Sequence, residues 1–309
     1  MRRVPIALTA VSVVLGLAAS PAAATAGSSE RSASTAAVCS VELGSVTAGG
    51  DYTTQRITAT TPPTAAARVI TPNLTPNGGV RFTSHQLSYL SGSSYYKGGW
   101  AVIGSGMYFV RYRAFSNGAI DPAEPPILRR SGGGWDRFTA FENSTYWYNQ
   151  TTVGEHRYGL RDDGTLVRWS VSDVGYWTAA GSATGFSAVK TMALISKTAK
   201  YDTFLATTRG GALYTIHIPH AMPMKPVVKK VRSSTWQGFE TLVAAKCGQY
   251  GTLLLAIDKD TKAGYLYAVG HANGTTTVIQ SRGKVPYSFA DPVYYRWATS
   301  LTSDHLNGE

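Results

Sequence analysis

The sequence has little charge, only two cysteines and no long hydrophobic run after its first residues. Charged residues make up 15% of its 309 residues, below the roughly 25% typical of soluble domains. The apolar fraction of 43% can still form a hydrophobic core, which argues against a disordered chain and against a long coiled coil. The 32 glycines and 14 prolines favour many short strands joined by turns over long helices.

Several catalytic and cofactor motifs are also missing. The chain contains no G-x-S-x-G nucleophile turn, no H-E-x-x-H metal pair and no glycine-rich phosphate loop. We therefore predict no cofactor and no bound metal, and we favour a non-catalytic protein over an enzyme.

Residues 1–26 have the features of a secretory signal peptide. Arg2 and Arg3 supply positive charge, residues 6–19 are largely apolar, and residues 24–26 form a small-x-small cleavage pattern. The apolar stretch is shorter than the ~20 residues of a membrane span, which disfavours a retained membrane helix. We predict cleavage before Gly27, a disordered lead-in over 27–38, and a secreted, extracellular protein with no membrane anchor.

The two cysteines, Cys39 and Cys247, both follow this segment. An even count in an oxidising compartment predicts one disulfide bond, although two free buried thiols remain an alternative. A bond between them would hold the start of the folded chain against its C-terminal third.

A repeat of about 50 residues runs through the chain. Five segments share apolar residues at their fourth and seventh positions: SHQLSYL from Ser84, WDRFTAF from Trp135, FSAVKTM from Phe186, WQGFETL from Trp236 and YSFADPV from Tyr287. Between them, apolar runs flank Gly106, Gly164, Gly211 and Gly264, which is the pattern of a hairpin with a glycine in its turn. Four strands in about 50 residues is the period of a propeller blade.

The last unit is too short to form a blade by itself. Strand-like runs at 41–46, 52–58 and 66–71 can complete it, since a ring closed in this way has no free sheet edge. We predict an all-β chain in which residues 39–309 form a single β-propeller domain. Five four-stranded blades with a composite closing blade are favoured, and six blades are the alternative.

Two blade openings carry a family resemblance. The segments SGGGWDRF from Ser131 and SSTWQGF from Ser233, with Gly-x-Leu-Tyr at Gly211 and Gly264, resemble the repeats of tachylectin-like five-bladed propellers. Other units depart from the pattern, because Ser84, Phe186 and Tyr287 replace the tryptophan. The resemblance implies a lectin-like protein that binds N-acetylated amino sugars between adjacent blades.

The predicted ligand-binding residues come from these two openings. They are Gly133, Gly134, Trp135, Asp136, Arg137, Trp236 and Gln237. An aromatic plane suits the C–H face of a sugar ring, and fixed polar groups suit its hydroxyls. Blade-packing roles for both tryptophans are the alternative. The predicted partner is a glycan or a cell-wall polysaccharide.

Two other functions remain open, an extracellular hydrolase with a site at the central channel and a protein-binding scaffold. Asp121 with Glu124, or Glu142 with Glu155, could pair as glycosidase carboxylates. His217 and the nearby His220 could share a metal only if a turn brought them together.

The net charge of +11 invites a nucleic-acid hypothesis, which export disfavours. Basic residues gather on the predicted outer strands, at Arg129, Arg130, Lys225, Lys229, Lys230 and Arg232. Lysines there discourage edge-to-edge pairing between molecules. We therefore expect no nucleic-acid partner and a monomeric protein.

Overall fold

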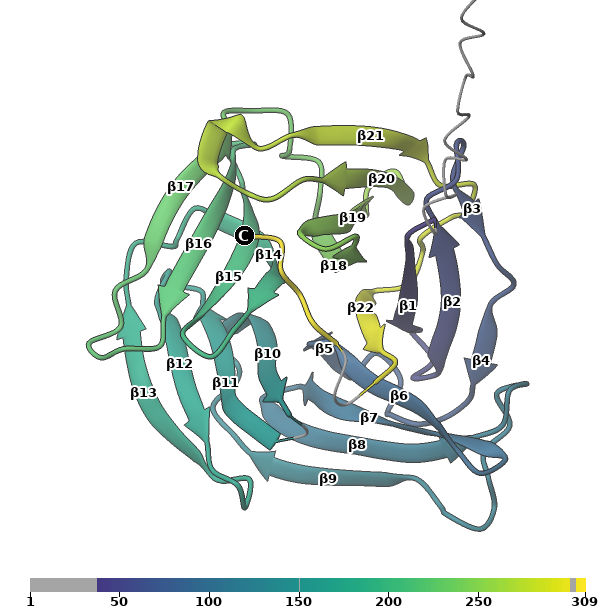
Figure 1. Cartoon of the computed structure of the whole chain (residues 1–309). Helices are drawn as coiled ribbons and strands as arrows, with labels where there is room; N and C mark the ends of the chain where they lie inside the picture. Colours follow the sequence, from purple (N-terminus) through teal and green to yellow (C-terminus); the bar gives the residue numbers. More distant parts are fainter. Residues whose placement is uncertain (1–37, 150, 301–303) are drawn as a thin grey trace, which may run out of the picture. The chain divides into compact units, whose positions relative to one another are not determined.

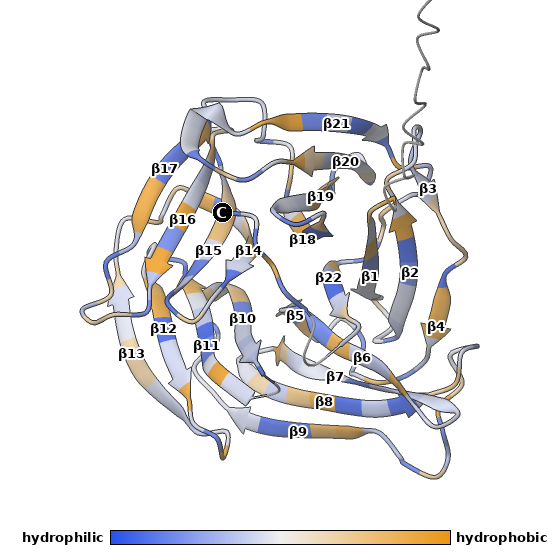
Figure 2. Cartoon of the chain, in the orientation of Figure 1, coloured by the Kyte–Doolittle hydropathy of each residue, from blue (hydrophilic) through white to orange (hydrophobic). Residues whose placement is uncertain are grey.

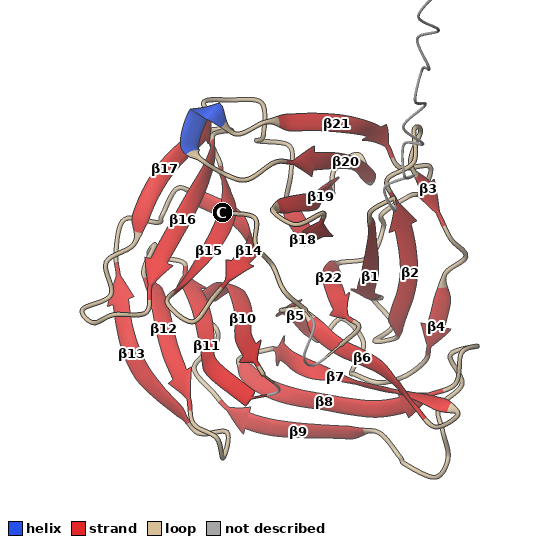
Figure 3. Ribbon diagram, viewed as in Figure 1, coloured by secondary structure: helices blue, strands red, loops and turns tan. Residues whose placement is uncertain are grey.

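The computed structural model describes residues 38–149, 151–300 and 304–309. The predicted signal peptide, and all of the predicted lead-in except Val38, lie outside these residues. The regular structure is almost entirely β: 22 strands and one 3-10 turn, Gly274–Thr276 (Figures 1 and 3). Among the described residues, no helix is long and apolar enough to span a bilayer.

Three of the sheets contain four strands in simple up-and-down order. The first is β10 (Phe138–Tyr148), β11 (Thr151–Arg161), β12 (Leu166–Val171) and β13 (Trp177–Ala183). The second is β14 (Val189–Lys197), β15 (Tyr201–Thr208), β16 (Leu213–Pro219) and β17 (Val227–Arg232). The third is β18 (Thr241–Cys247), β19 (Gly251–Asp258), β20 (Ala263–Val269) and β21 (Ile279–Lys284). These three sheets match the predicted repeat units.

The fourth sheet joins the two ends of the chain. Its N-terminal strands are β1 (Ser40–Val46), β2 (Tyr52–Thr58), β3 (Thr64–Ala65) and β4 (Val69–Thr71). Its other strands are β5 (Val80–Thr83), β6 (Gln86–Ser91), β7 (Ser94–Ile103), β8 (Gly106–Ala114), β9 (Ile127–Gly132) and the C-terminal β22 (Val293–Ala298). Strand β22 pairs antiparallel with β1 and parallel with β6. The C-terminal strand therefore completes a run of N-terminal strands, as predicted.

The chain is a β-propeller, and its core lies between neighbouring sheets. Five clusters of buried apolar residues lie between successive groups of strands around the ring. Strands β5, β10, β14, β18 and β22 all contribute residues to one central cavity, so they are the innermost strands (Figure 1). Packing of sheet faces around a centre removes apolar surface from water at every boundary.

Glycine permits the tight hairpin turns of these units. Gly164 and Gly211 have φ angles of 81° and 88°, a region that side chains other than glycine rarely adopt. A Cβ atom on Gly164 would also lie 2.2 Å from the backbone nitrogen of Ser187. The sequence pattern located these two turns correctly, whereas Gly106 and Gly264, which it also placed in turns, lie in β8 and β20.

The predicted alignment of the first unit is wrong. It equates Leu90 with Phe141 and Met192, which are 4% and 8% exposed, whereas Leu90 is 62% exposed. The inner strand of this unit is split into β5 and β6, and both pieces pair with β7. The unit therefore begins before Ser84, in a stretch that lacks the repeat's aromatic residue.

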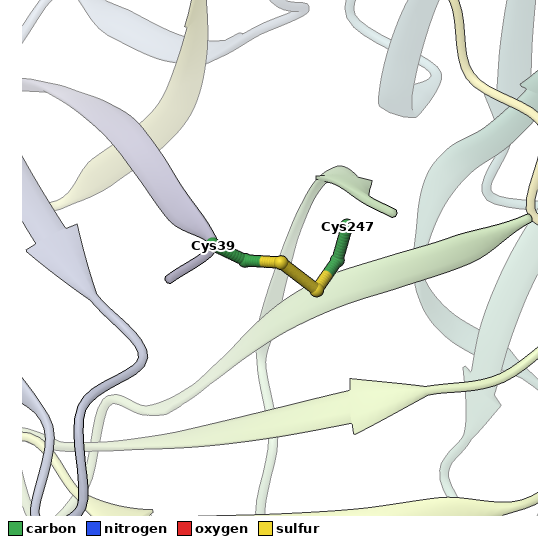
Figure 4. The surroundings of a disulfide bond; sticks show 2 residues. All are labelled: Cys39 and Cys247. Carbon is green, nitrogen blue, oxygen red and sulfur yellow. A yellow bond between two sulfur atoms is a disulfide. The ribbon is translucent and has the colours of Figure 1, made fainter. Parts of the chain in front are cut away.

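The predicted disulfide bond is present. Cys39 precedes β1 and Cys247 ends β18, and their Cα atoms are 5.3 Å apart (Figure 4). The bond links the composite run of strands to the neighbouring sheet β18–β21. It closes a loop across 208 residues of sequence.

The outer strands carry the basic residues, as the sequence indicated. On β17 an apolar pair, Val227 and Val228, is followed by Lys229 and Lys230, and all four are exposed. The strand accordingly changes from hydrophobic to hydrophilic along its length (Figure 2). Strand β9 is exposed along its whole length and includes Arg129. These charges lie on strand edges, where they oppose pairing with another molecule.

Candidate functional site

An aromatic groove lies at the boundary between strands β6–β9 of the fourth sheet and the sheet of β10–β13. Its volume is about 780 Å³. The walls and floor are formed by Trp100, Met107, Phe109, Trp135, Phe138, Trp169 and Trp177. The rim is formed by Arg129, Ser131, Gly132, Gly133, Gly134, Val174, Gly175 and Tyr176. Four of the seven tryptophans of the chain therefore line this single groove.

The four tryptophans hold one another in place across the boundary. Trp100 on β7 meets Trp177 on β13 edge to face, with ring centroids 5.0 Å apart. Trp135 lies 5.6 Å from Trp169 and 6.3 Å from Trp177, measured between ring centroids. Contacts of this kind fix the ring orientations before any ligand arrives.

The groove exists because the core at this boundary is small. Only four described residues form its buried cluster, Val102, Met107, Trp135 and Phe141, whereas each of the other four clusters holds eleven or more. Trp100, Trp169 and Trp177 pack against this cluster but are only partly buried. Their remaining faces are available to a ligand.

The rim combines exposed apolar and polar groups. Tyr176 and Val174 are 74% and 78% exposed and lie in the turn between β12 and β13. Across the groove, Arg129 and the Gly132–Gly134 backbone are exposed. A glycine backbone has no side chain to prevent close approach of a ligand.

The structure brings three of the predicted ligand-binding residues into the groove: Gly133, Gly134 and Trp135. Trp135 is only 6% exposed, so it forms the floor rather than an open stacking platform. Asp136 and Arg137 follow it but do not line the groove. The Arg137 guanidinium instead donates to Asp162 at 2.9 Å.

Of the second predicted pair, Trp236 lies in a packed boundary, whereas Gln237 is exposed. Trp236 is 5% exposed and belongs to the core cluster between the sheets of β14–β17 and β18–β21. Its ring contacts Tyr267 at a centroid distance of 5.1 Å. Packing in the core is therefore the role that the geometry supports for Trp236.

Sequence reasoning missed most of the groove. Trp100, Trp169 and Trp177 lie on β7, β12 and β13, and nothing in the linear sequence indicates that these strands converge. The available signal was a high density of aromatic residues in the first two units.

A second cavity lies at the centre, lined by all five innermost strands. Glu142 on β10 faces it, and burial raises the pKa of this carboxyl to about 7, against the lowering effects of Arg296 and of backbone N–H groups. Such a carboxyl can hold or release a proton near neutral pH, which is the property of a general acid or base.

The other carboxylates of the centre are paired. Glu240 forms an ion pair with Lys190, and Asp304 accepts hydrogen bonds from Arg296 and Lys197. The pKa of Asp304 is lowered by its basic neighbours, whereas the pKa of Glu142 is raised. Glu142 is therefore the carboxyl of this region that most readily holds a proton.

Neither predicted pair of glycosidase carboxylates is assembled as a pair in one cavity. Glu142 lines the central cavity, whereas Glu155 lines a neighbouring one and forms an ion pair with Arg157. Asp121 accepts a hydrogen bond from Ser94, and Glu124 pairs with Arg113.

The two histidines suggested as a shared metal pair face different partners. His217 lies on β16 with its Nδ1 atom 2.6 Å from Glu309 Oε2. His220 follows the same strand, and its Nε2 atom is 3.0 Å from Asp202 Oδ2. Three residues along an extended strand place two side chains on opposite faces, so no turn brings them together.

No known protein family matches this sequence, and no curated protein matches it as a relative. Solved structures with some likeness include the catalytic domain of a GH62 α-L-arabinofuranosidase from Coprinopsis cinerea, with a TM-score of 0.43 and 12% identity over 74% of this chain and 80% of that one. A second is the α-L-arabinofuranosidase PaAbf62A from Podospora anserina in complex with cellotriose. Its TM-score is 0.41, and the identity is 13% over 74% of this chain and 76% of that one. A third is the periplasmic gluconolactonase PpgL from Pseudomonas aeruginosa, with a TM-score of 0.43 and 10% identity over 81% of each chain. Likenesses this distant say nothing about the chemistry of the present chain.

Proposed function

We propose that this protein is an exported glycan-binding protein that holds sugar residues in the aromatic groove. The observation that carries the proposal is the set of partly buried tryptophans, Trp100, Trp169 and Trp177, around one open groove. Sugar rings present flat C–H faces that stack on such rings. Arg129 and the exposed glycine backbone on the rim supply groups that can hydrogen-bond to hydroxyls.

The proposed ligand class is an N-acetylated amino sugar or a cell-wall polysaccharide that contains it. This choice follows the resemblance of the blade openings to tachylectin-like propellers. The groove is lined by apolar side chains such as Phe109 and Phe138, against which an acetyl methyl group could pack. Export is proposed from the sequence of residues 1–26, and the disulfide bond is compatible with an oxidising compartment.

The number of sugar sites differs from the sequence prediction. The resemblance implied binding at two blade boundaries, but the boundary of Trp236 is packed. We therefore propose one principal site per chain. Avidity would then require several copies of the protein on one polymer.

Binding of chitin-derived oligosaccharides and of a broad glycan array tests the proposal. Tryptophan fluorescence can follow binding, because the ligand would contact the indole rings directly. Trp177→Ala and Tyr176→Ala should each weaken binding, the first by at least about tenfold, equivalent to about 1.4 kcal/mol. Tyr250→Ala is the matched control, since Tyr250 is 55% exposed and lies away from the groove in the β18–β19 turn.

Two results would contradict the proposal. One is the absence of binding to every glycan tested. The other is binding that both groove variants leave unchanged.

A second candidate function is hydrolysis of a glycoside or a lactone at the central cavity. The raised pKa of Glu142 favours it, because a carboxyl poised near neutral pH suits proton transfer to a leaving group. Aryl glycosides and lactones are suitable substrates for the assay. This function would be supported if Glu142→Gln abolished the activity and Glu124→Gln, at the surface, preserved it.

A further inference from the structure

Two histidines and one aspartate meet where two neighbouring sheets adjoin. His156 comes from β11, Asp202 from β15, and His220 from the residue after β16. The Nδ1 atom of His156 and the Nε2 atom of His220 lie 3.7 Å and 3.0 Å from the same oxygen, Asp202 Oδ2. The potential ligand atoms of these three side chains all lie within 4.8 Å of one another, and the described residues contain no other such group.

Surrounding groups hold the Asp202 carboxylate in position. It is fully buried and accepts hydrogen bonds from the Tyr158 hydroxyl at 2.6 Å and from the Ser144 hydroxyl at 2.5 Å. Tyr158 and Ser144 belong to the sheet of β10–β13, whereas Asp202 belongs to the next one. The carboxylate is thus fixed from across the boundary between the two sheets.

The His220 ring is fixed as well. Its Nδ1 atom lies 3.3 Å from the carbonyl oxygen of Ala199, which can only accept a hydrogen bond. The buried Arg168 guanidinium donates to the carbonyl oxygens of Pro219 and His220 at 2.7 Å and 3.1 Å. Metal-binding histidines commonly have their second nitrogen held in this way.

One tautomer of His220 leaves a lone pair on its Nε2 atom that a metal ion can bind. With a proton on Nδ1 for the Ala199 carbonyl, the Nε2 atom of a neutral ring presents a lone pair to Asp202 Oδ2 at 3.0 Å. Two acceptors at this distance repel each other. A cation bound between these two atoms removes that repulsion, and the nearby Nδ1 atom of His156 provides a further ligand atom.

We propose that His156, Asp202 and His220 form a binding site for a divalent first-row transition metal ion, with Zn²⁺ as the test ion. A tetrahedral zinc ion with bonds of about 2.0–2.2 Å holds its ligand atoms roughly 3.3–3.6 Å apart. The observed 3.0 Å and 3.7 Å lie on either side of this range. Imidazole nitrogen favours transition metals over Ca²⁺ and Mg²⁺.

The site would join two sheets through a metal ion. His156 lies on one sheet, and Asp202 and His220 lie on or beside strands of the next. The histidine side chains are 13% and 15% exposed, so water can complete the coordination. The metal would stabilise this boundary as the disulfide bond stabilises another. The sequence had indicated no metal site, because the three residues are far apart along the chain.

Zinc titration of the chelator-washed protein, prepared without a polyhistidine tag, tests the proposal. We expect one zinc ion per chain in the presence of excess Mg²⁺, and a higher melting temperature with zinc. His156→Gln and His220→Gln should each weaken binding at least tenfold. His271→Gln should not, because His271 is exposed and its ring contacts Tyr250 in another sheet. Asp202 is left unchanged in this test, since loss of a buried acceptor could prevent folding.

A second measurement separates this site from adventitious binding to surface histidines. The Co²⁺-loaded protein should show ligand-field absorption that the His156→Gln/His220→Gln double variant lacks, while circular dichroism shows both proteins to be folded. The proposal is overturned if the wild-type protein does not bind zinc. It is equally overturned if the double variant binds zinc with the wild-type affinity.

Discussion

The indole rings of Trp100 and Trp177 meet edge to face at a centroid distance of 5.0 Å, across the boundary between two sheets. One ring comes from β7 and the other from β13, about 77 residues apart in the sequence. The pair therefore contributes both to the wall of the groove and to the cohesion of the two sheets. Any variant of this pair changes binding and stability together.

A double-mutant cycle can measure how much the contact between the two rings contributes to stability. We expect Trp100→Leu and Trp177→Leu to be less destabilising together than the sum of the two single changes. The expected coupling is about 0.5–1.5 kcal/mol, the range found for aromatic pairs beyond their burial. Urea unfolding of the four proteins measures it. Strictly additive effects would show that the rings do not interact energetically.

Loss of the disulfide bond should destabilise the whole domain. Cys39 and Cys247 are separated by 208 residues, and closing so large a loop restricts the unfolded chain by up to about 5 kcal/mol in the chain-entropy model. The Cys39→Ser/Cys247→Ser variant should therefore melt at a clearly lower temperature than the oxidised protein. The reduced wild-type protein is the control, and it should resemble the variant. A melting temperature equal to that of the oxidised protein would contradict this prediction.

The sequence predicted the fold well because the determinants of the fold are local. Several hairpins are encoded by apolar runs around a turn with glycine, as at Gly164 and Gly211, and such turns depend on local backbone conformation. The disulfide and the composite closure followed from counting cysteines and strands. The first unit was misaligned because its inner strand is broken between Thr83 and Gln86, and a break of this kind leaves no periodic signal.

The site was less predictable because it depends on contacts between units. Trp135 was identified from its motif, but the structure places it on the groove floor, at 6% exposure. The partly exposed faces belong to Trp100, Trp169 and Trp177, whose convergence depends on how two sheets pack. The same holds for Glu142, because its raised pKa results from burial at the centre of the ring.

Glu142 should make stability depend on pH. Burial raises its pKa from 4.5 to about 7, so between these values the folded chain retains a proton that the unfolded chain has released. Stability contributed by this group therefore falls as pH rises from about 4.5 to 7, by at most about 3 kcal/mol. Glu142→Gln removes the ionisable group. The stability of this variant relative to the wild type should therefore be higher at pH 8 than at pH 4.

Urea unfolding of both proteins at the two pH values measures this effect. Glu124→Gln is a suitable control, because Glu124 pairs with Arg113 near the surface. Its effect on stability should be small at both pH values. If the stability difference between the wild type and Glu142→Gln is the same at both pH values, the carboxyl does not titrate in this range.

The pairing of β22 with β1, which joins the two ends of the chain, should be sensitive to the addition of one methyl group. Gly44 lies on β1 opposite Tyr295 of β22, and a Cβ atom there would lie 2.3 Å from the Tyr295 ring and 2.8 Å from Trp297 Nε1. Both aromatic side chains are buried, so neither can move aside without disturbing the core. Gly44→Ala should therefore cost about 2–3 kcal/mol.

Thermal unfolding provides the measurement, and Gly132→Ala provides the matched control. Gly132 also lies in a strand, but a Cβ atom there would meet nothing within 4 Å, so the control should melt within a few degrees of the wild type. Gly44→Ala should melt about 5–10 °C lower. Because β22 pairs with β1 at this point, equal melting temperatures for the two variants would show that close packing of β22 on β1 does not limit the stability of the ring.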